Sequence, residues 1–317
     1  MRILFVTSNR IGDAVLSSGV LAQLVERHPE AKVTVACGSL PASLFADLPQ
    51  LERLHVMTRK KRGAHWLSLW SSCIGHYWSQ VADVRGSALG WLLLAGKRMA
   101  TRSEPWQGHK VEELARQLKL PSLPHPRLWV SDQRDQRIAA QLGDGPPILA
   151  VAPAANWFPK QWPEDRFIAA IQRLTAPGAM LDGARLAVFG APTERQWAEP
   201  VLQAVPPERR LDCIGQSDLL DSYAILRRSA FFLGNDSGMM HLAAAAGIPT
   251  LGLFGPSPEE RYGPWGDKAL AVRGPRSYRE MVFLNPDFDH KSQDNMMLDL
   301  TVDRVVEAAE ALWTRCR

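Results

Sequence analysis

Asp13 is the first residue in this chain whose type and position point to chemistry. It follows the apolar run Ile3–Val6 and a polar turn, at the point where a helical pattern begins. A carboxylate placed there can take a proton from a bound hydroxyl group as a general base. It can equally cap the helix or occupy its first turn, and the residues alone leave both interpretations open.

A second candidate site is the segment Gly234–His241, which reads GNDSGMMH and opens an alanine-rich helical pattern. A small turn at the start of a helix presents backbone N–H groups and the positive end of the helix dipole, and both suit a diphosphate. His241 is expected on the first turn of that helix. A lone histidine there is more often structural than functional, so its spacing from Asp236 is suggestive only.

Three further loops follow predicted strands. Asn156–Pro163 contains Lys160, which could neutralise a phosphate or be an ordinary solvated lysine. Glu194 could accept hydrogen bonds from ribose hydroxyls or be a first-turn helix acid. The third loop, Phe254–Pro258, follows the predicted strand Thr250–Phe254. Because ligands of open α/β sheets bind beyond the carboxyl ends of the strands, these loops are candidate binding segments.

The elements that would position these loops alternate between strand and helix patterns, and the alternation restarts after the breaker Gly143–Pro147. This predicts an α/β fold with two parallel-sheet units, residues 1–145 and 146–317. Strands are expected at Ile3–Val6, Lys32–Ala36, Val81–Val84, Ile148–Val151, Arg185–Phe189, Ala230–Leu233 and Thr250–Phe254, and helices at Ala14–Arg27, Val111–Leu118, Glu164–Leu174, Thr193–Ala204, Leu219–Ser229, Met239–Ala246 and Val302–Trp313.

Composition agrees with two globular domains. The 317 residues are 46% hydrophobic and 22% charged, which excludes a disordered or fibrous chain. The longest apolar stretches are too short for a signal peptide or a membrane span, so we expect a soluble intracellular protein. The four cysteines, Cys37, Cys73, Cys213 and Cys316, have no close or repeated spacing, which argues against a disulfide framework or a zinc knuckle.

The charge distribution and the loop motifs limit the classes of function that fit the chain. The net charge is +4, and the basic excess lies in the first 145 residues, so that half is expected to meet an anion. No recognition motif for nucleic acid accompanies this excess. The loop Thr7–Asp13 has neither the G-x-G-x-x-G spacing nor a Walker lysine, which weakens a nicotinamide dehydrogenase and a P-loop enzyme.

Taken in order, these motifs resemble glycosyltransferase family 9, the bacterial ADP-heptose:lipopolysaccharide heptosyltransferases. The resemblance is carried by Met1–Leu4 with Ile11–Asp13, by Lys160–Pro163, by Asp236–His241 and by Leu253–Ser257. Weaker matches to the family's motifs lie at Asp83–Ser87, His109–Glu112 and Asp299–Val302. The resemblance implies the GT-B architecture, with two facing Rossmann-like domains: residues 1–145 would bind the acceptor and residues 146–317 the nucleotide-sugar.

The resemblance also implies a reaction and its residues. It is the inverting transfer of a heptose from ADP-heptose to a Kdo or heptose hydroxyl of the lipopolysaccharide inner core. The family would use Asp13 as catalytic base and Lys160 to contact the donor phosphate and stabilise the departing ADP. The implied donor site is Lys160, Glu194, Asp236, Ser237, Gly238 and His241, and the implied acceptor site is Ser8, Asn9, Arg10, Gly12, Arg59, Lys60, Lys61 and Arg62.

The same likeness implies a cytoplasmic enzyme, with the cytoplasmic face of the inner membrane as a possible location. It implies no required cofactor or metal, although magnesium could stimulate the reaction. Asp287–Asp289 reads D-x-D, the metal motif of the other glycosyltransferase architecture, but it follows Asn285–Pro286 in a polar loop and is better explained as a turn. Ser237, where many relatives carry threonine, the bulky Arg10 and the aromatic stretch Asn156–Phe158 depart from the family pattern and could alter which sugar fits.

A basic run and an aromatic stripe follow each other in the first half. Arg59–Arg62 is either a solvated loop or a contact for the carboxylates and phosphates of the acceptor. Trp66, Leu69, Trp70, Cys73 and Tyr77 recur at helical spacing and predict one face of a helix. Most such stripes belong to a core, but basic residues beside such a face also suit contact with a membrane surface.

Charge reversal at Lys60 and Lys61 gives a first prediction. If the run binds an anionic acceptor, the Lys60→Glu, Lys61→Glu variant raises the KM for the acceptor and leaves the KM for the donor almost unchanged, because like charges repel. Steady-state kinetics with each substrate varied in turn measure both constants. An unchanged acceptor KM removes the basic run from the mechanism.

Two other functions fit the same scaffold. One is a different nucleotide-sugar enzyme, such as an epimerase, which turns over its substrate without an acceptor. The other is a non-catalytic protein that binds nucleotides or anionic glycans, for which Asp13 would have another role. Dependence of turnover on an acceptor separates these two alternatives from the transferase.

Overall fold

The computed structural model describes residues 1–58, 63–216, 218–289, 291 and 294–317. The chain divides into two compact units, Met1–Asp132 and Gln133–Arg317. Each is an α/β unit built on one parallel sheet, which confirms the predicted fold class. Within the described residues no helix is long and apolar enough to cross a membrane.

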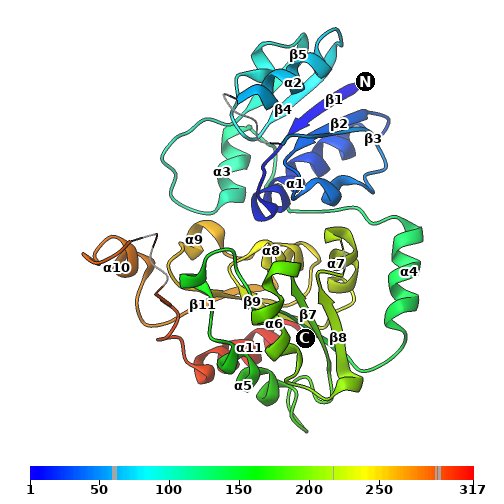
Figure 1. Cartoon of the computed structure of the whole chain (residues 1–317). Helices are drawn as coiled ribbons and strands as arrows, with labels where there is room; N and C mark the ends of the chain where they lie inside the picture. Colours follow the sequence, from blue (N-terminus) through cyan, green and yellow to red (C-terminus); the bar gives the residue numbers. More distant parts are fainter. Residues whose placement is uncertain (59–62, 217, 290, 292–293) are drawn as a thin grey trace. The chain divides into compact units, whose positions relative to one another are not determined.

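The first unit contains a five-stranded sheet in the order β3-β2-β1-β4-β5 (Figure 1). Every neighbouring pair of strands is parallel, so the carboxyl ends of all five strands lie along one edge. The elements of this unit are β1 Arg2–Val6, α1 Ile11–Arg27, β2 Lys32–Cys37, η1 Ala42–Phe45, β3 Leu51–Val56, α2 Ala64–Cys73, β4 Trp78–Asp83, η3 Leu89–Trp91, β5 Ala95–Ala100 and α3 Lys110–Gln117.

Helix α1 begins three residues earlier than the sequence predicts, so Asp13 lies inside its first turn. Most of the helix is buried, from Ala14 to Val25. At Gly19 the backbone of the segment around Pro124 and His125 crosses the helix closely: a Cβ at this position would lie 2.5 Å from the carbonyl oxygen of His125 and in contact with that of Pro124. The close crossing explains why glycine occupies the middle of a buried helix.

This crossing yields a stability prediction. Gly19→Ala is expected to lower the free energy of unfolding by about 1–3 kcal/mol, because two backbone carbonyls must move to admit the methyl group. The loss outweighs the better helix propensity of alanine. Urea unfolding followed by circular dichroism measures it, with exposed Arg27→Ala on the same helix as the control, expected within about 0.5 kcal/mol of wild type. A Gly19→Ala variant as stable as wild type contradicts the close approach.

The second unit contains a six-stranded sheet in the order β11-β10-β9-β6-β7-β8, again with every described pair of neighbours parallel. Its elements are α4 Asp132–Leu142, β6 Ile148–Ala152, η4 Phe158–Lys160, α5 Glu164–Leu174, β7 Arg185–Gly190, η5 Pro192–Glu194, α6 Arg195–Leu202, η6 Pro207–Arg209, β8 Arg210–Ile214, α7 Leu219–Leu226, β9 Phe231–Asn235, α8 Gly238–Ala245, β10 Thr250–Phe254, α9 Glu259–Tyr262, β11 Ala269–Arg273, α10 Tyr278–Val282 and α11 Val302–Cys316.

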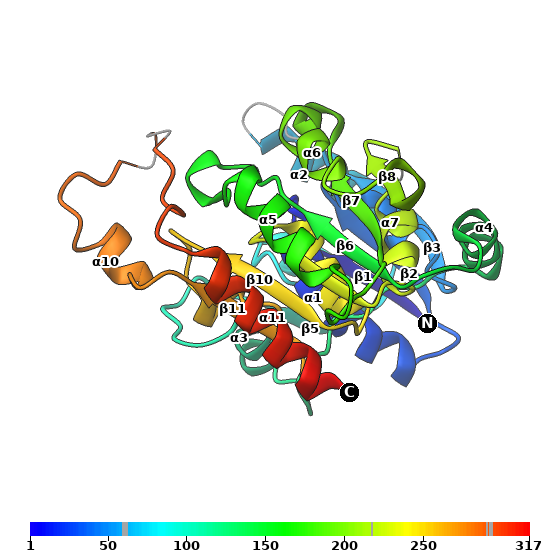
Figure 2. The same ribbon diagram turned by 90° about the horizontal axis from the view of Figure 1, so that it is seen from below.

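Helices α5, α6 and α11 cover one face of this sheet, with α5 and α11 side by side (Figure 2). Trp162, just before α5, is almost fully buried and meets the ring of Phe167 edge to face, with the ring centroids 4.9 Å apart. The indole N–H of Trp162 donates to the carbonyl of Leu300 over 2.9 Å. This anchors the loop that contains Lys160 to the core of the unit.

Helix α4 explains why the division between the units falls at Asp132 rather than near residue 145. Arg134 of α4 pairs with Asp218 and Asp221 of the second unit. Asp135 pairs with Arg228, and the N···O distance is 2.7 Å. These ion pairs attach the helix to the second unit, although the Gly143–Pro147 breaker separates it from that unit's first strand.

Two sequence predictions need correction. Helix α2 ends at Cys73, so Tyr77 of the aromatic stripe lies beyond the helix and is exposed. Leu69 and Cys73 are buried in the core of the first unit, and Trp66 and Trp70 pack against that core. Strands β3, β5, β8 and β11 were not predicted. Each is an edge strand of its sheet, and β3, β5 and β8 carry polar or charged residues that break the apolar pattern.

All four cysteines are free thiols. Cys37, Cys73 and Cys213 are buried. Burial raises the pKa of Cys37 and of Cys213 to about 12, so neither is a nucleophile at neutral pH.

Candidate functional site

Asp13 lies at the carboxyl edge of the first sheet, half-buried on the first turn of α1. The hydroxyl of Ser8 donates to Oδ2 of Asp13 over 3.3 Å and also accepts the backbone N–H of Arg10. Arg10 is the N-cap residue of α1, but its side chain makes no capping hydrogen bond. The carboxylate of Asp13 therefore has a fixed partner in its own loop and is partly open to solvent, as a general base requires.

Asp83, at the carboxyl end of β4, builds the loop beside Asp13. Its side chain is 1% exposed and accepts hydrogen bonds from the backbone N–H groups of Arg85 and Ser87, each over 2.9 Å, and from the hydroxyl of Ser87. Arg85 then donates to Oδ1 of Asn9 over 3.2 Å. The loop after β4 is thereby joined to the loop after β1.

Asp83 also gives a pH-dependent prediction. Burial raises its pKa above the ordinary value of 3.8, although the hydrogen bonds from Ser87 and Arg85 oppose this rise. The folded state therefore holds the proton more tightly than the unfolded chain. The stabilisation from this group is complete below about pH 4 and is lost as the pH rises through the raised folded pKa.

Replacement with asparagine removes this titration. The free energy of unfolding of wild type minus that of Asp83→Asn is expected to decrease between about pH 4 and pH 7. Urea unfolding of both proteins across that range measures the difference, and any lost hydrogen bond of the amide contributes a nearly constant offset. A difference that instead grows with pH would mean that the hydrogen bonds to the carboxylate outweigh its burial.

In the second unit, Asn235 at the end of β9 positions the loop after β6. Its side chain is fully buried; Oδ1 accepts the backbone N–H of Trp162 over 3.0 Å, and the amide nitrogen donates to the carbonyl of Pro153. Gln161 donates within the same loop to the carbonyl of Ala155. The loop is thus held at both ends against the carboxyl edge of the sheet, and Lys160 lies between these two attachments.

Lys160 and Asp236 form the central contact of this edge. Nζ of Lys160 lies 3.1 Å from Oδ2 of Asp236, and the two side chains are 14% and 11% exposed. The backbone N–H of Asp236 donates to the carbonyl of Leu253 in β10. A largely buried ammonium group held by one carboxylate at the start of a helix is a suitable binding partner for a phosphate.

Two buried serine hydroxyls lie at the same edge. Ser237 is the N-cap residue of α8 and makes no side-chain capping bond, and Ser257 lies in the loop after β10. In the part of the chain that the structure describes, Oγ of each is buried and has no hydrogen-bond partner. A buried hydroxyl without a partner costs stability, which is recovered when a ligand supplies the bond.

Gly238 begins α8, and His241 lies buried on the first turn of that helix, as the sequence predicts. Together with Lys160, Asp236 and Ser237, these residues form one cluster in the second unit. Glu194 is the last residue of η5, the turn that follows β7, and strand β6 lies between β7 and β9 in the sheet. Its Oε2 accepts the backbone N–H of Ala191 over 2.7 Å, so its observed role is to cap a turn, and a ribose contact remains a prediction.

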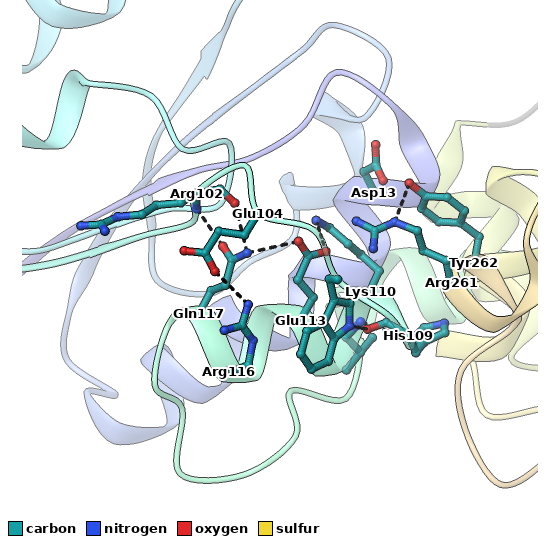
Figure 3. A network of polar contacts seen from close by, with 12 residues as sticks. Asp13, Arg102, Glu104, His109, Lys110, Glu113, Arg116, Gln117, Arg261 and Tyr262 are labelled. Atoms are coloured by element: carbon teal, nitrogen blue, oxygen red, sulfur yellow. Dashed lines mark hydrogen bonds and ion pairs between the residues drawn. The ribbon is translucent and has the colours of Figure 1, made fainter.

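Other sequence candidates have structural roles or lie outside the described residues. His109 is the N-cap residue of α3 and forms a capping box with Glu112, followed by a Lys110–Glu113 ion pair of 2.8 Å (Figure 3). Asp287 lies in a turn that is closed by a hydrogen bond from Phe288 to Asn285, as expected for the D-x-D stretch. The basic run 59–62 lies outside the described residues, so its acceptor role remains a prediction.

Sequence reasoning missed the contribution of Arg85 and Trp66. Arg85 lies over the ring of Trp66, with its guanidinium carbon 4.9 Å from the ring centroid. The sequence signal that could have found this pair is the D-V-R-G-S motif at Asp83–Ser87. Its arginine follows a buried carboxylate at the end of a strand.

Comparison with known proteins agrees with this arrangement. The sequence profile described as glycosyltransferase family 9 (heptosyltransferase) matches residues 84–285. Lipooligosaccharide heptosyltransferase 2 of Haemophilus influenzae is 24% identical, over 86% of this chain and 88% of that protein. Lipopolysaccharide heptosyltransferase 2 of Salmonella typhimurium is 22% identical, over 98% of both.

Solved structures show the same fold. The E. coli ADP-heptose lps heptosyltransferase II has a TM-score of 0.73 at 20% identity and covers 99% of both chains. The family 9 glycosyl transferase of Veillonella parvula has a TM-score of 0.77 at 19% identity and covers 99% of this chain and 97% of its own. The profile spans more than half of the chain and includes the loops that contain Lys160, Glu194 and Asp236, whereas the loop that contains Asp13 lies before the matched residues. The chain therefore belongs to glycosyltransferase family 9 and is a glycosyltransferase with the two parallel-sheet α/β domains of the GT-B fold.

Proposed function

We propose that this enzyme transfers a heptose from ADP-heptose to a hydroxyl of the lipopolysaccharide inner core, with inversion at the anomeric carbon. The cluster of Lys160, Asp236 and the start of α8 carries the proposal, because it combines a largely buried cation, a helix N-terminus and a buried hydroxyl that has no partner among the described residues. These groups match the charge of a diphosphate. The relatives act on lipopolysaccharide or lipooligosaccharide by name, and one solved relative of this fold contains ADP.

In the proposed reaction the second unit binds the donor. The diphosphate accepts hydrogen bonds from Lys160 and from the backbone at Ser237 and Gly238, and His241 lines the same site. Glu194 contacts the ribose. As the bond between the anomeric carbon and the diphosphate oxygen breaks, negative charge develops on ADP, and the ammonium group of Lys160 stabilises it.

The first unit binds the acceptor. Ser8, Asn9, Arg10 and Gly12 form the loop around it, and the basic run 59–62 contributes positive charge. Asp13 accepts the proton of the acceptor hydroxyl as its oxygen bonds to the anomeric carbon. The products are ADP and the extended glycolipid, with the proton on the Asp13 carboxyl group until solvent removes it. No metal is assigned a role in these steps.

The proposed substrates indicate where in the cell the enzyme acts. We propose a cytoplasmic enzyme that meets its glycolipid acceptor at the cytoplasmic face of the inner membrane, since the acceptor is anchored there and ADP-heptose is water-soluble. No nucleic acid partner is proposed.

The test incubates the protein with ADP-heptose and heptose-less Kdo-lipid A, and follows ADP release together with the mass of the acceptor. We expect ADP release only when acceptor is present, with a gain of one heptose per acceptor. Turnover without acceptor supports the epimerase alternative, and binding without turnover supports a non-catalytic protein. A parallel reaction in chelator is expected to retain activity; loss of activity that magnesium restores would overturn the metal-free scheme.

A further inference from the structure

An apolar groove on the first unit is not explained by the residues assigned so far. It has a volume of about 670 Å³. Its walls come from α2 and from the chain between β4 and β5, which includes η3, and among the residues that line it are Trp66, Trp70, Arg85, Leu89 and Leu92. The groove lies entirely within one compact unit.

Of the described residues that line this groove, Arg85 is the one that carries a charge. Among the described residues it makes no ion pair: its side chain donates to the neutral amide of Asn9 and lies over Trp66. It is also half-buried, and burial lowers its pKa, although nearby Asp83 opposes this effect. Asp83 already accepts the bonds of its own loop. A half-buried guanidinium group without a carboxylate partner fits an anion, with which it can form two parallel hydrogen bonds.

The two tryptophans indicate which kind of ligand ring the groove can bind. Trp66 and Trp70 lie one turn apart on α2 and both are half-buried, so part of each ring is open to the groove. The indole N–H of Trp70 donates to the carbonyl of Leu92 across the groove, which fixes its ring. Flat apolar faces beside a cation suit a pyranose ring, whose C–H face is apolar and whose substituents can be acidic.

The groove is connected to the catalytic loop. Arg85 donates to Asn9, and Ser8, the residue before Asn9, donates to Asp13. An anion held by Arg85 would therefore lie next to the loop that contains the proposed general base. An isolated acyl chain would satisfy the apolar walls but would leave the guanidinium group without its anion.

We infer that this groove binds an acidic sugar of the acceptor, with its carboxylate or phosphate on Arg85 and its ring against Trp66 and Trp70. The inference rests on the proposed function, because it takes the acceptor to be the molecule bound next to Asp13. It assigns Arg85 a role in acceptor specificity and none in the chemical step.

The first test measures binding without turnover. Saturation-transfer NMR compares methyl β-D-glucuronide with methyl β-D-glucoside, which has the same ring without the carboxylate. We expect signal from the glucuronide alone, lost in Arg85→Gln and partly kept in Arg85→Lys, with Trp66→Leu reducing it as well. Arg27→Gln and Trp91→Leu are matched controls, since both residues are exposed in the same unit and neither lines the groove.

The second test uses transfer kinetics. Arg85→Gln is expected to raise the acceptor KM about 10- to 100-fold, with kcat and the donor KM nearly unchanged, as for a lost hydrogen-bonded charge. The inference is overturned if glucuronide binding is unchanged in Arg85→Gln, or if both sugars give equal signals. It is also overturned by dodecyl maltoside binding that is unaffected by Arg85→Gln and displaces the glucuronide. If wild type shows no transfer but binds glucuronide through Arg85, the proposed function fails and the groove assignment stands.

Discussion

Asp13→Asn is expected to lower kcat for heptose transfer by about 10²- to 10⁴-fold, the range for removal of a general base. Asparagine has nearly the same size as aspartate and can still accept the hydrogen bond from Ser8, so the loop should keep its shape. It cannot take the proton of the acceptor hydroxyl. The donor KM should stay within about twofold of wild type, because the donor is assigned to the other unit. Coupled detection of ADP with saturating acceptor measures both constants.

Two further variants sharpen this test. Ser8→Ala removes the hydrogen bond to Asp13 but leaves the carboxylate, so we expect a loss of only about 5- to 10-fold in kcat, in line with about 1 kcal/mol for one such bond. Glu26→Gln replaces an exposed carboxylate at the other end of α1 and should leave kcat unchanged. If Asp13→Asn retained more than a tenth of wild-type kcat, another group would have to be the base.

The sequence predicts most of the sheet centre and the loops at its carboxyl edge, because these depend on local pattern. Strand β10 and helix α5 have the predicted bounds, since a mostly apolar run and a strong helical repeat leave few alternatives. Strands such as β5, with Lys97 and Arg98 exposed, lack that pattern and depend on pairing with a neighbouring strand, here β4. Their existence depends on distant neighbours, which a local pattern does not contain.

The candidate site divides in the same way. The order of strand, turn and helix places Asp13, Asp236 and His241 without any knowledge of packing. The Lys160–Asp236 contact joins residues 76 positions apart, and it depends on Asn235 holding the loop after β6. The groove beside Arg85 depends on how α2 packs on β4, and the spacing of its tryptophans alone is equally typical of a buried core. Long-range packing therefore decides which chemically suitable residues meet.

Lys160→Met gives the second large expected effect, on the donor side. Removing one preorganised electrostatic contact to a leaving group costs about 10²- to 10³-fold in kcat. Methionine has a similar length and no charge, so it keeps the apolar contacts of the lysine stem. Lys268→Met, an exposed lysine of the same unit, is the matched control and should retain full activity.

The ion pair complicates this result, because Lys160→Met leaves the carboxylate of Asp236 largely buried without its cation. That charge would repel a diphosphate and destabilise the unit, so a lower kcat could come from Asp236 rather than from the missing ammonium group. The double variant Lys160→Met, Asp236→Asn separates the two causes. It should recover the stability lost in the single variant, measured as Tm, because no unpaired charge remains.

Its activity decides the role of Lys160. If the ammonium group stabilises the departing ADP, the double variant stays about 10²-fold below wild type in kcat even after its Tm has recovered. If Lys160 only neutralises Asp236, kcat recovers together with Tm. Lys160→Arg adds a third point: it keeps the charge, so it should retain more kcat than Lys160→Met, while the different shape of the guanidinium group keeps it below wild type. Recovery of kcat in the double variant would remove Lys160 from the chemical step and leave it as a support for the turn that begins α8.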